Sequence, residues 1–178
     1  MSSYFIKTPR ILRTIFSKYT WRFNTQKKEI FLTFDDGPTE NITPWVLTTL
    51  KKYNAKATFF CIGKNIENSP AIFKQLLLEG HAIGNHTHNH LQGWKSTSKK
   101  YIENVLIAEK TMQKFSDSVI SKKLFRPPYG KIKKKQARRL QNLGYQIVMW
   151  EVLSADFDKS INKEKCLENV LKNTEKGS

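Results

Sequence analysis

The segment IFLTFDDGP, residues 30–38, has the pattern of a short strand that ends in a turn. Its first five residues are mostly apolar and favour an extended chain, whereas Asp35-Asp36-Gly37-Pro38 is a turn signal. A helix is expected to begin near Thr43-Pro44, because threonine can cap a helix and proline fits its first turn. The segment therefore predicts a strand–turn–helix unit with two carboxylates at the carboxyl end of the strand.

Strand and helix patterns alternate along the rest of the chain, which is typical of parallel strands covered by helices, in an open sheet or a closed barrel. In such folds the chemistry gathers at the carboxyl ends of the strands, and the unusual polar residues of this sequence follow predicted strands. Further strands are predicted over residues 57–62, 82–85, 124–126 and 145–150, with helices from Pro70 to Gly80, from Ser98 to Phe115, up to Gly144 and after Ser160.

All four histidines lie between His81 and His90. His86 and His90 are four residues apart, so on a helical turn they would point the same way and could bind one divalent metal ion. A carboxylate from Asp35-Asp36 would complete a set of two histidines and one acid, with positions left open for water and substrate. His81 precedes its strand and His88 would point away, so neither is a predicted ligand. The alternative is an adventitious metal site.

The net charge of +16 is the most unusual feature of the composition. Residues 122–139 alone hold nine lysines or arginines and no acid. Such a cluster can attract nucleic acid, an anionic lipid surface or an acidic glycan. No aromatic or glycine pattern of a nucleic-acid module accompanies it, so we predict a solvated helix face and no nucleic-acid partner.

The composition, with 39% hydrophobic residues and eleven phenylalanines, is that of one folded domain. No apolar stretch approaches the roughly 18 residues of a membrane helix. The N-terminal residues form at most a weakly amphipathic surface helix over residues 11–19, with no signal peptide, which predicts a cytoplasmic location by default. Cys61 lies in an apolar run and is predicted to be a buried thiol.

Three motifs occur in order: residues 33–38 (Thr-Phe-Asp-Asp-Gly-Pro), 86–90 (His-Thr-His-Asn-His) and 126–130 (Arg-Pro-Pro-Tyr-Gly). Together they resemble the NodB-homology polysaccharide deacetylases, carbohydrate esterase family 4. The resemblance covers residues 28–178 and leaves residues 1–27 outside as a basic segment. It implies an α/β fold, a parallel-strand distorted (β/α) barrel. It also implies a hydrolase that removes N- or O-acetyl groups from peptidoglycan or a chitin-like or xylan-like glycan. Members of this family often act at the cell wall, in contrast to the cytoplasmic location expected by default.

The resemblance assigns roles to individual residues. Asp35 is the expected base that activates water, and Arg126 is expected to pair with it and keep it ionised. Asp36, His86 and His90 are the expected ligands of one divalent metal ion. Zinc is the usual metal of the family, and cobalt, nickel or iron are alternatives.

Further roles fall on two loops. The backbone N–H of Tyr129, next to Pro128, is expected to hold the developing oxyanion. Many family members have Asp-Ser-x-Asp-Trp where residues 153–157 of this chain read Leu-Ser-Ala-Asp-Phe. Asp156 matches the acid that tunes the family's catalytic histidine, and Phe157 matches a wall of the substrate groove without the indole N–H.

The last motif of the family is a strand with Leu-x-His, whose histidine protonates the leaving group. This sequence has no histidine after His90, and it ends at Ser178, where that strand would begin. The resemblance therefore predicts a barrel that is incomplete at its C-terminus. It also predicts a 178-residue chain with weak activity, because general acid help contributes about 10²–10⁴-fold.

Three alternatives stay open at this point. The chain could be a catalytically impaired remnant that binds metal and glycan, a non-haem iron oxygenase with two histidines and one acid, or a nucleic-acid binder whose affinity falls with salt. The second acid, Asp35, together with Arg126 favours hydrolysis. The expected partner is an acetylated carbohydrate, and the sequence does not indicate an oligomeric state.

Overall fold

A computed structural model describes residues 4–116, 120 and 122–178. By its internal packing the chain forms two compact units. The first, called the central unit here, comprises Leu32–Ile147. The second, called the terminal unit, combines the residues up to Phe31 with Val148–Ser178.

The central unit contains a parallel sheet whose five strands pair in sequence order. Phe34 lies opposite Phe59, and Phe59 lies opposite Ile83, so apolar residues align across the first three strands. The parallel α/β fold predicted from the sequence is confirmed. The strands are β1 (Thr33–Asp35), β2 (Thr58–Cys61), β3 (Ala82–Asn85), β4 (Leu124–Phe125) and β5 (Gln146–Ile147).

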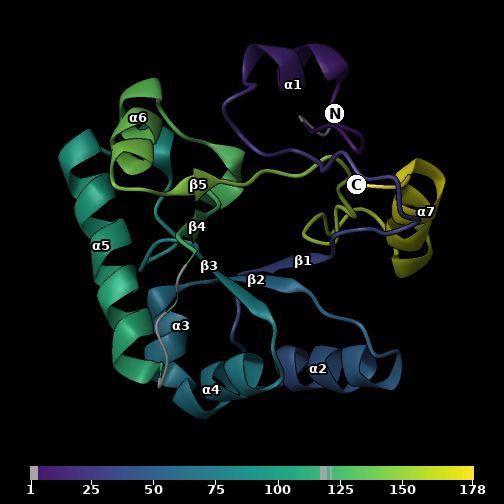
Figure 1. Cartoon of the computed structure of the whole chain (residues 1–178), viewed down its shortest axis with the longest axis horizontal. Helices are drawn as coiled ribbons and strands as arrows, with labels where there is room; N and C mark the ends of the chain where they lie inside the picture. Colours follow the sequence, from purple (N-terminus) through teal and green to yellow (C-terminus); the bar gives the residue numbers. More distant parts are fainter. Residues whose placement is uncertain (1–3, 117–119, 121) are drawn as a thin grey trace. The chain divides into compact units, whose positions relative to one another are not determined.

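The helices of the central unit follow the strands and lie along the outside of the sheet (Figure 1). Their inner faces bury residues such as Leu47, Phe73 and Leu76 against the strands, and Cys61 is buried in the same cluster, as predicted. Burial of each such side chain stabilises the fold by about 1.5–3 kcal/mol. The helices are α2 (Ile42–Lys52), α3 (Gly63–Asn68), α4 (Pro70–Leu78), α5 (Ser98–Phe115) and α6 (Lys134–Asn142).

Two predicted strands, residues 30–34 and 145–150, extend well beyond the observed β1 and β5. Residues 30–32 are exposed and precede β1, and the Phe31 N–H donates to the carbonyl of Ser178 inside the terminal unit. Val148, expected in the last strand, instead forms a bridge with Thr20. Both apolar runs are therefore divided between the sheet and the terminal unit, and apolar patterning alone does not mark such a division.

The terminal unit is held together by pairings between its two segments. Lys7 forms an antiparallel bridge with Val152, and the Phe23 N–H donates to Gly177. Gly177 has a φ of +82°, and a Cβ there would lie 2.1 Å from the carbonyl oxygen of Phe23, so glycine is required. The unit contains α1 (Arg10–Ile15), shorter than the predicted surface helix, and α7 (Lys163–Asn173).

Among the described residues, no helix combines the length and the apolar character needed to cross a membrane.

Candidate metal and catalytic site

The predicted site residues of the central unit gather at the carboxyl ends of its strands. Asp35 is the last residue of β1 and Asp36 follows it. His86 comes directly after β3, and Arg126 directly after β4. Because neighbouring parallel strands end at the same edge of a sheet, these side chains meet there.

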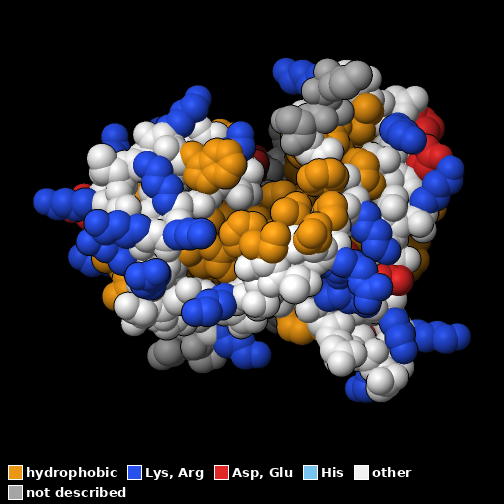
Figure 2. Space-filling view, turned by 90° about the horizontal axis from the view of Figure 1, so that it is seen from above, with side chains coloured by type: hydrophobic (Ala, Val, Ile, Leu, Met, Phe, Trp, Pro, Cys, Tyr) orange, Lys and Arg blue, Asp and Glu red, His pale blue; other side chains and the backbone are white. Residues whose placement is uncertain are grey.

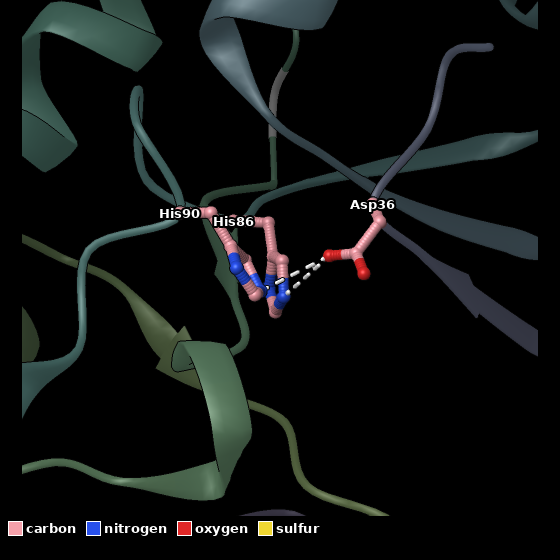
Figure 3. Close-up of side chains that lie close together, drawn as sticks. All are labelled: Asp36, His86 and His90. Atoms are coloured by element: carbon pink, nitrogen blue, oxygen red, sulfur yellow. Dashed lines mark ion pairs between the residues drawn. The ribbon is translucent and has the colours of Figure 1, made fainter. Parts of the chain in front are cut away.

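Asp36, His86 and His90 converge on one point (Figure 3). The Oδ1 of Asp36 lies 3.4 Å from the Nε2 of His86 and 3.2 Å from the Nε2 of His90. Zinc bonds of about 2.0–2.1 Å at tetrahedral angles would put ligand atoms roughly 3.4 Å apart. The donor set and its spacing therefore fit a divalent metal ion. Asp36 is exposed, which leaves one side of the site open to water and substrate.

The loop from His86 to His90 brings the two imidazoles together without a helix, contrary to the helical turn assumed from their spacing. Thr87 and His90 have φ values of 65° and 53°, in the left-handed region that residues other than glycine rarely adopt. Hydrogen bonds hold this strained backbone in place: the Thr87 N–H donates to the Asn85 side chain, and the His88 N–H donates to Asn104 of α5. Strain of this kind is found at functional sites.

Arg126 fixes the orientation of His86 through its backbone. The carbonyl oxygen of Arg126 lies 2.7 Å from Nδ1 of His86, which is buried. Since a carbonyl only accepts hydrogen bonds, Nδ1 carries the proton and Nε2 is left with its lone pair toward Asp36 and His90. This is the tautomer that a metal ligand needs.

The guanidinium of Arg126 fixes Asp35. Its Nη1 donates to Asp35 Oδ1 at 2.8 Å and to Thr33 Oγ1 at 2.7 Å, and its Cζ lies 4.2 Å from the centre of the Phe60 ring. The Arg126 side chain is only 3% exposed, whereas Asp35 is 32% exposed. Burial lowers the pKa of Arg126, and Asp35 opposes that shift. The buried cation therefore holds a carboxylate that reaches solvent.

The protonation states at the three-residue cluster suit metal binding. Partial desolvation acts to raise the pKa of Asp36, but His86 and His90 in their protonated forms favour its carboxylate more strongly, so the pKa lies below its usual value. A metal ion bound there would take the place of those protons and leave the imidazoles neutral. Burial lowers the pKa of His90, helped by His86 and opposed by Asp36. An ionised acid and a neutral imidazole are the forms that bind metal.

The backbone of Asp36 is also in the left-handed region. Asp36 has a φ of 67°, and its carbonyl accepts a hydrogen bond from Asn65.

Tyr129 lies beside the cluster. Its ring centre is 4.5 Å from that of His90, and its φ of 60° interrupts the short helix η2 (Pro128–Gly130), in which Pro128 is buried. Within the described residues the N–H of Tyr129 has no hydrogen-bond partner. It is thus available as a donor, which the predicted oxyanion role requires.

The other two histidines lie elsewhere. His81 is buried and its Nδ1 accepts from the Ala57 N–H at 3.2 Å, while the Nε2 of His88 faces Glu67 of α3 at 3.8 Å. Neither belongs to the candidate ligand cluster of Asp36, His86 and His90.

Asp156 and Phe157 belong to the terminal unit, so their predicted roles stay predictions. Asp156 accepts a hydrogen bond from Ser154, and the Phe157 ring packs edge-on against Tyr4.

Sequence reasoning missed the asparagines that support the site. Asn65, Asn85 and Asn104 each bond the backbone of a loop that carries a candidate ligand. Asn85 precedes His86 directly, a position typical of a local side-chain-to-backbone turn, and this signal could have identified it. Asn104 is contributed by a helix, and no local pattern marks it.

Taken together, the parallel sheet and the two-histidine, one-acid cluster at its edge define an α/β protein with a candidate metal centre. The family model described as "Polysaccharide deacetylase" matches residues 22–148, and the chain belongs to this family.

Relatives of known name support the assignment. The chain is 39% identical over 159 residues to a peptidoglycan-N-acetylglucosamine deacetylase of Bacillus cereus, covering 89% of this chain and 73% of that protein. It is 37% identical over 163 residues to a second B. cereus protein of that name, covering 90% of this chain and 58% of the relative. The match to the Listeria monocytogenes enzyme PgdA is 38% over 130 residues, 73% of this chain and 27% of that protein.

Solved structures share the fold. The Bc1960 peptidoglycan N-acetylglucosamine deacetylase superposes with a TM-score of 0.86 at 35% identity, covering 96% of this chain and 78% of that chain. Bacillus subtilis PdaA, a family 4 carbohydrate esterase, superposes with a TM-score of 0.83 at 28% identity, covering 96% and 74%.

Proposed function

We propose that this chain hydrolyses acetyl groups on a cell-wall glycan, with one divalent metal ion held by Asp36, His86 and His90. The observation that carries the proposal is that two groups of side chains meet at one edge of the sheet. One group is the candidate ligand cluster, and the other is the Asp35–Arg126 pair beside it. A binding site for iron alone would need only the first set, whereas hydrolysis also needs a base.

Each residue has a step in this reaction. Asp35 takes a proton from the attacking water while Arg126 holds its carboxylate in place. The oxyanion that forms on the acetyl carbonyl accepts a hydrogen bond from the Tyr129 N–H. The carbon–nitrogen or carbon–oxygen bond then breaks, and the proton on Asp35 is available for the leaving atom. When bound, the metal ion supplies Lewis-acid chemistry that polarises the carbonyl and lowers the pKa of water.

Zinc is the proposed metal. Two imidazoles and one carboxylate with one open side match its tetrahedral preference, and the distances of 3.2 and 3.4 Å agree with this. Peptidoglycan with N-acetylglucosamine units is the proposed substrate, because two relatives at 37% and 39% identity are named peptidoglycan-N-acetylglucosamine deacetylases.

The test has two parts. Zinc titration by calorimetry should give one equivalent per chain, and His90→Ala should lose it. Hydrolysis of 4-nitrophenyl acetate should depend on added zinc and stop with a chelator. An aryl ester is chosen because its leaving group needs no proton, so the assay tests the base and the metal alone. Acetate release from N-acetylglucosamine oligomers then tests the amide.

Two results would contradict the proposal. Full zinc retention in His90→Ala would show that the ligands are misassigned. Stoichiometric zinc binding with no zinc-dependent ester hydrolysis would show that the chain is a metal-binding form of the fold without the proposed activity.

A further inference from the structure

The loop that carries His90 continues into an exposed tryptophan. Trp94 lies in the short helix η1 (Gly93–Lys95), and its side chain is exposed, with 59% of the residue surface accessible. Its indole N–H donates to the carbonyl of Ile132 at 3.2 Å, and the ammonium of Lys131 lies 5.5 Å from the centre of its ring. The ring is thus open to solvent on a large part of its surface while its edge is fixed.

A buried glutamine holds this loop rigidly. Gln136 of α6 is fully buried, and its Nε2 donates to the Gly93 carbonyl at 2.9 Å while its Oε1 accepts from the Lys133 N–H. A Cβ on Gly93 would lie 2.5 Å from the carbonyl oxygen of Lys131, so the close approach of the two loops requires glycine. The position of Trp94 is therefore preorganised, which lowers the entropy lost on binding.

Trp94 lies on the same pair of loops as residues of the candidate site. The rings of His90 and Tyr129 lie 4.5 Å apart, and the same two loops meet again at Trp94 and Lys131. Trp94 follows His90 by four residues, a reach of at most roughly 14 Å. Trp94 is therefore near enough for an oligosaccharide bound at the candidate site to reach it.

The charged side chains that contact the Trp94 loop in the described structure are lysines: Lys131 lies over the indole ring, and Lys133 donates to the Ser96 carbonyl. Lys95 and Lys131 form no ion pair within the described part of the chain, and Lys134 and Lys135 at the start of α6 are exposed. Figure 2 shows lysine and arginine side chains spread over the face that it draws, around a central group of apolar side chains, with fewer acids than bases. A field of this sign attracts an acidic ligand.

We propose that Trp94 and Lys131 form a subsite for a carboxylate-bearing sugar next to the acetylated one. The apolar C–H face of the sugar stacks on the indole ring, and the Lys131 ammonium meets the carboxylate. The inference rests on the proposed function and names the part of the glycan that decides specificity.

Binding is measured by calorimetry in the zinc-loaded Asp35→Asn background, so that nothing is turned over. The two ligands are a neutral N-acetylglucosamine tetramer and a tetramer alternating N-acetylglucosamine with N-acetylmuramic acid. Trp94→Leu should weaken both about tenfold, which is 1.4 kcal/mol, and Trp94→Phe should keep most of the affinity because it keeps a ring. Lys131→Gln should lower the affinity for the acidic tetramer only. Binding of the acidic tetramer to this variant should no longer depend on salt concentration.

The matched control is Trp45→Leu, since Trp45 is 67% exposed on α2, away from these loops in sequence. It should leave both affinities unchanged. Equal binding by Trp94→Leu and the parent, with unchanged melting temperature, would overturn the proposal, as would an equal loss in Trp45→Leu. Failure of the proposed function is seen separately, as absent zinc-dependent ester hydrolysis in the chain with Asp35 intact. The binding data decide the subsite in either case.

Discussion

The two units each contain an ion pair with one buried partner, but the buried partner differs. In the central unit the buried side chain is the cation Arg126, and its acid, Asp35, is 32% exposed. In the terminal unit the buried side chain is the acid Glu151, with no exposed surface, and it is paired with Arg13 and Arg22, which are 15% and 33% exposed.

The difference distinguishes an ion pair that serves chemistry from one that serves structure. An enclosed Glu151 cannot reach a ligand, and removing one partner of such a pair leaves uncompensated charge. The buried Arg126 guanidinium holds Oδ1 of Asp35, whereas its Oδ2 has no hydrogen-bond partner among the described residues and the side chain is partly exposed. Exposure of the acid, rather than the presence of the pair, therefore marks the candidate catalytic group.

The largest expected effect follows from removing the carboxylate of the central pair. Asp35→Asn keeps the size of the side chain and an oxygen for Arg126 but loses the base. Zinc-dependent hydrolysis of 4-nitrophenyl acetate should fall about 10²–10⁴-fold, because that is the contribution of a general base. Bound zinc, measured by metal analysis, should stay at one equivalent. Loss of zinc together with activity would show that Asp35 is a ligand.

The same type of substitution in the terminal pair should affect stability instead. Glu151→Gln removes the counter-charge of Arg13 and leaves Arg22 paired only with Glu175. We expect a loss of roughly 3 kcal/mol, at the low end for a broken buried pair because both arginines keep some exposure. The melting temperature should fall by about 6–12 °C. Ester hydrolysis per folded molecule should be unchanged. An unchanged melting temperature would show that the buried ion pairs of Glu151 do not stabilise the fold.

The smallest effect is expected where charges are exposed and form no ion pair in the described structure. On α6 these are Lys134, Lys135, Arg138 and Arg139. Changing Lys135, Arg138 and Arg139 to glutamine should each alter stability by less than about 0.5 kcal/mol. Gel-shift assays at near-physiological salt should show no sequence-selective binding of nucleic acid to the parent chain. Tight, selective binding lost in the variants would make this surface a functional one.

Much of the site could be predicted because its residues follow strands directly. Asp35, His86 and Arg126 each stand at or after the end of a strand, and the parallel order brings strand ends together. The apolar patterns also gave the type of each of the five strands. The short helix α3 was missed, since six residues are too few to show a helical period.

The remaining details depend on tertiary structure. The convergence of His86 and His90 comes from a loop with two left-handed residues, which their spacing of four does not reveal. The proton of His86 is placed by a backbone carbonyl that every residue possesses, so no sequence pattern marks it. The support from Asn104 comes from a helix that packs on the loop only in the folded chain.

The two-segment terminal unit has a consequence for the order of folding during synthesis. Thr8 bonds to Trp150, 142 residues further along, so the N-terminal segment leaves the ribosome long before its partners are made. The strands of the central unit pair in sequence order and can be added one at a time as they emerge. Pairing of the two terminal segments has to wait until residues 148–178 are made, and the long loop that it closes costs entropy before its contacts form. Until this pairing forms, residues 4–31 lack their partners in the terminal unit and are accessible to chaperones and proteases.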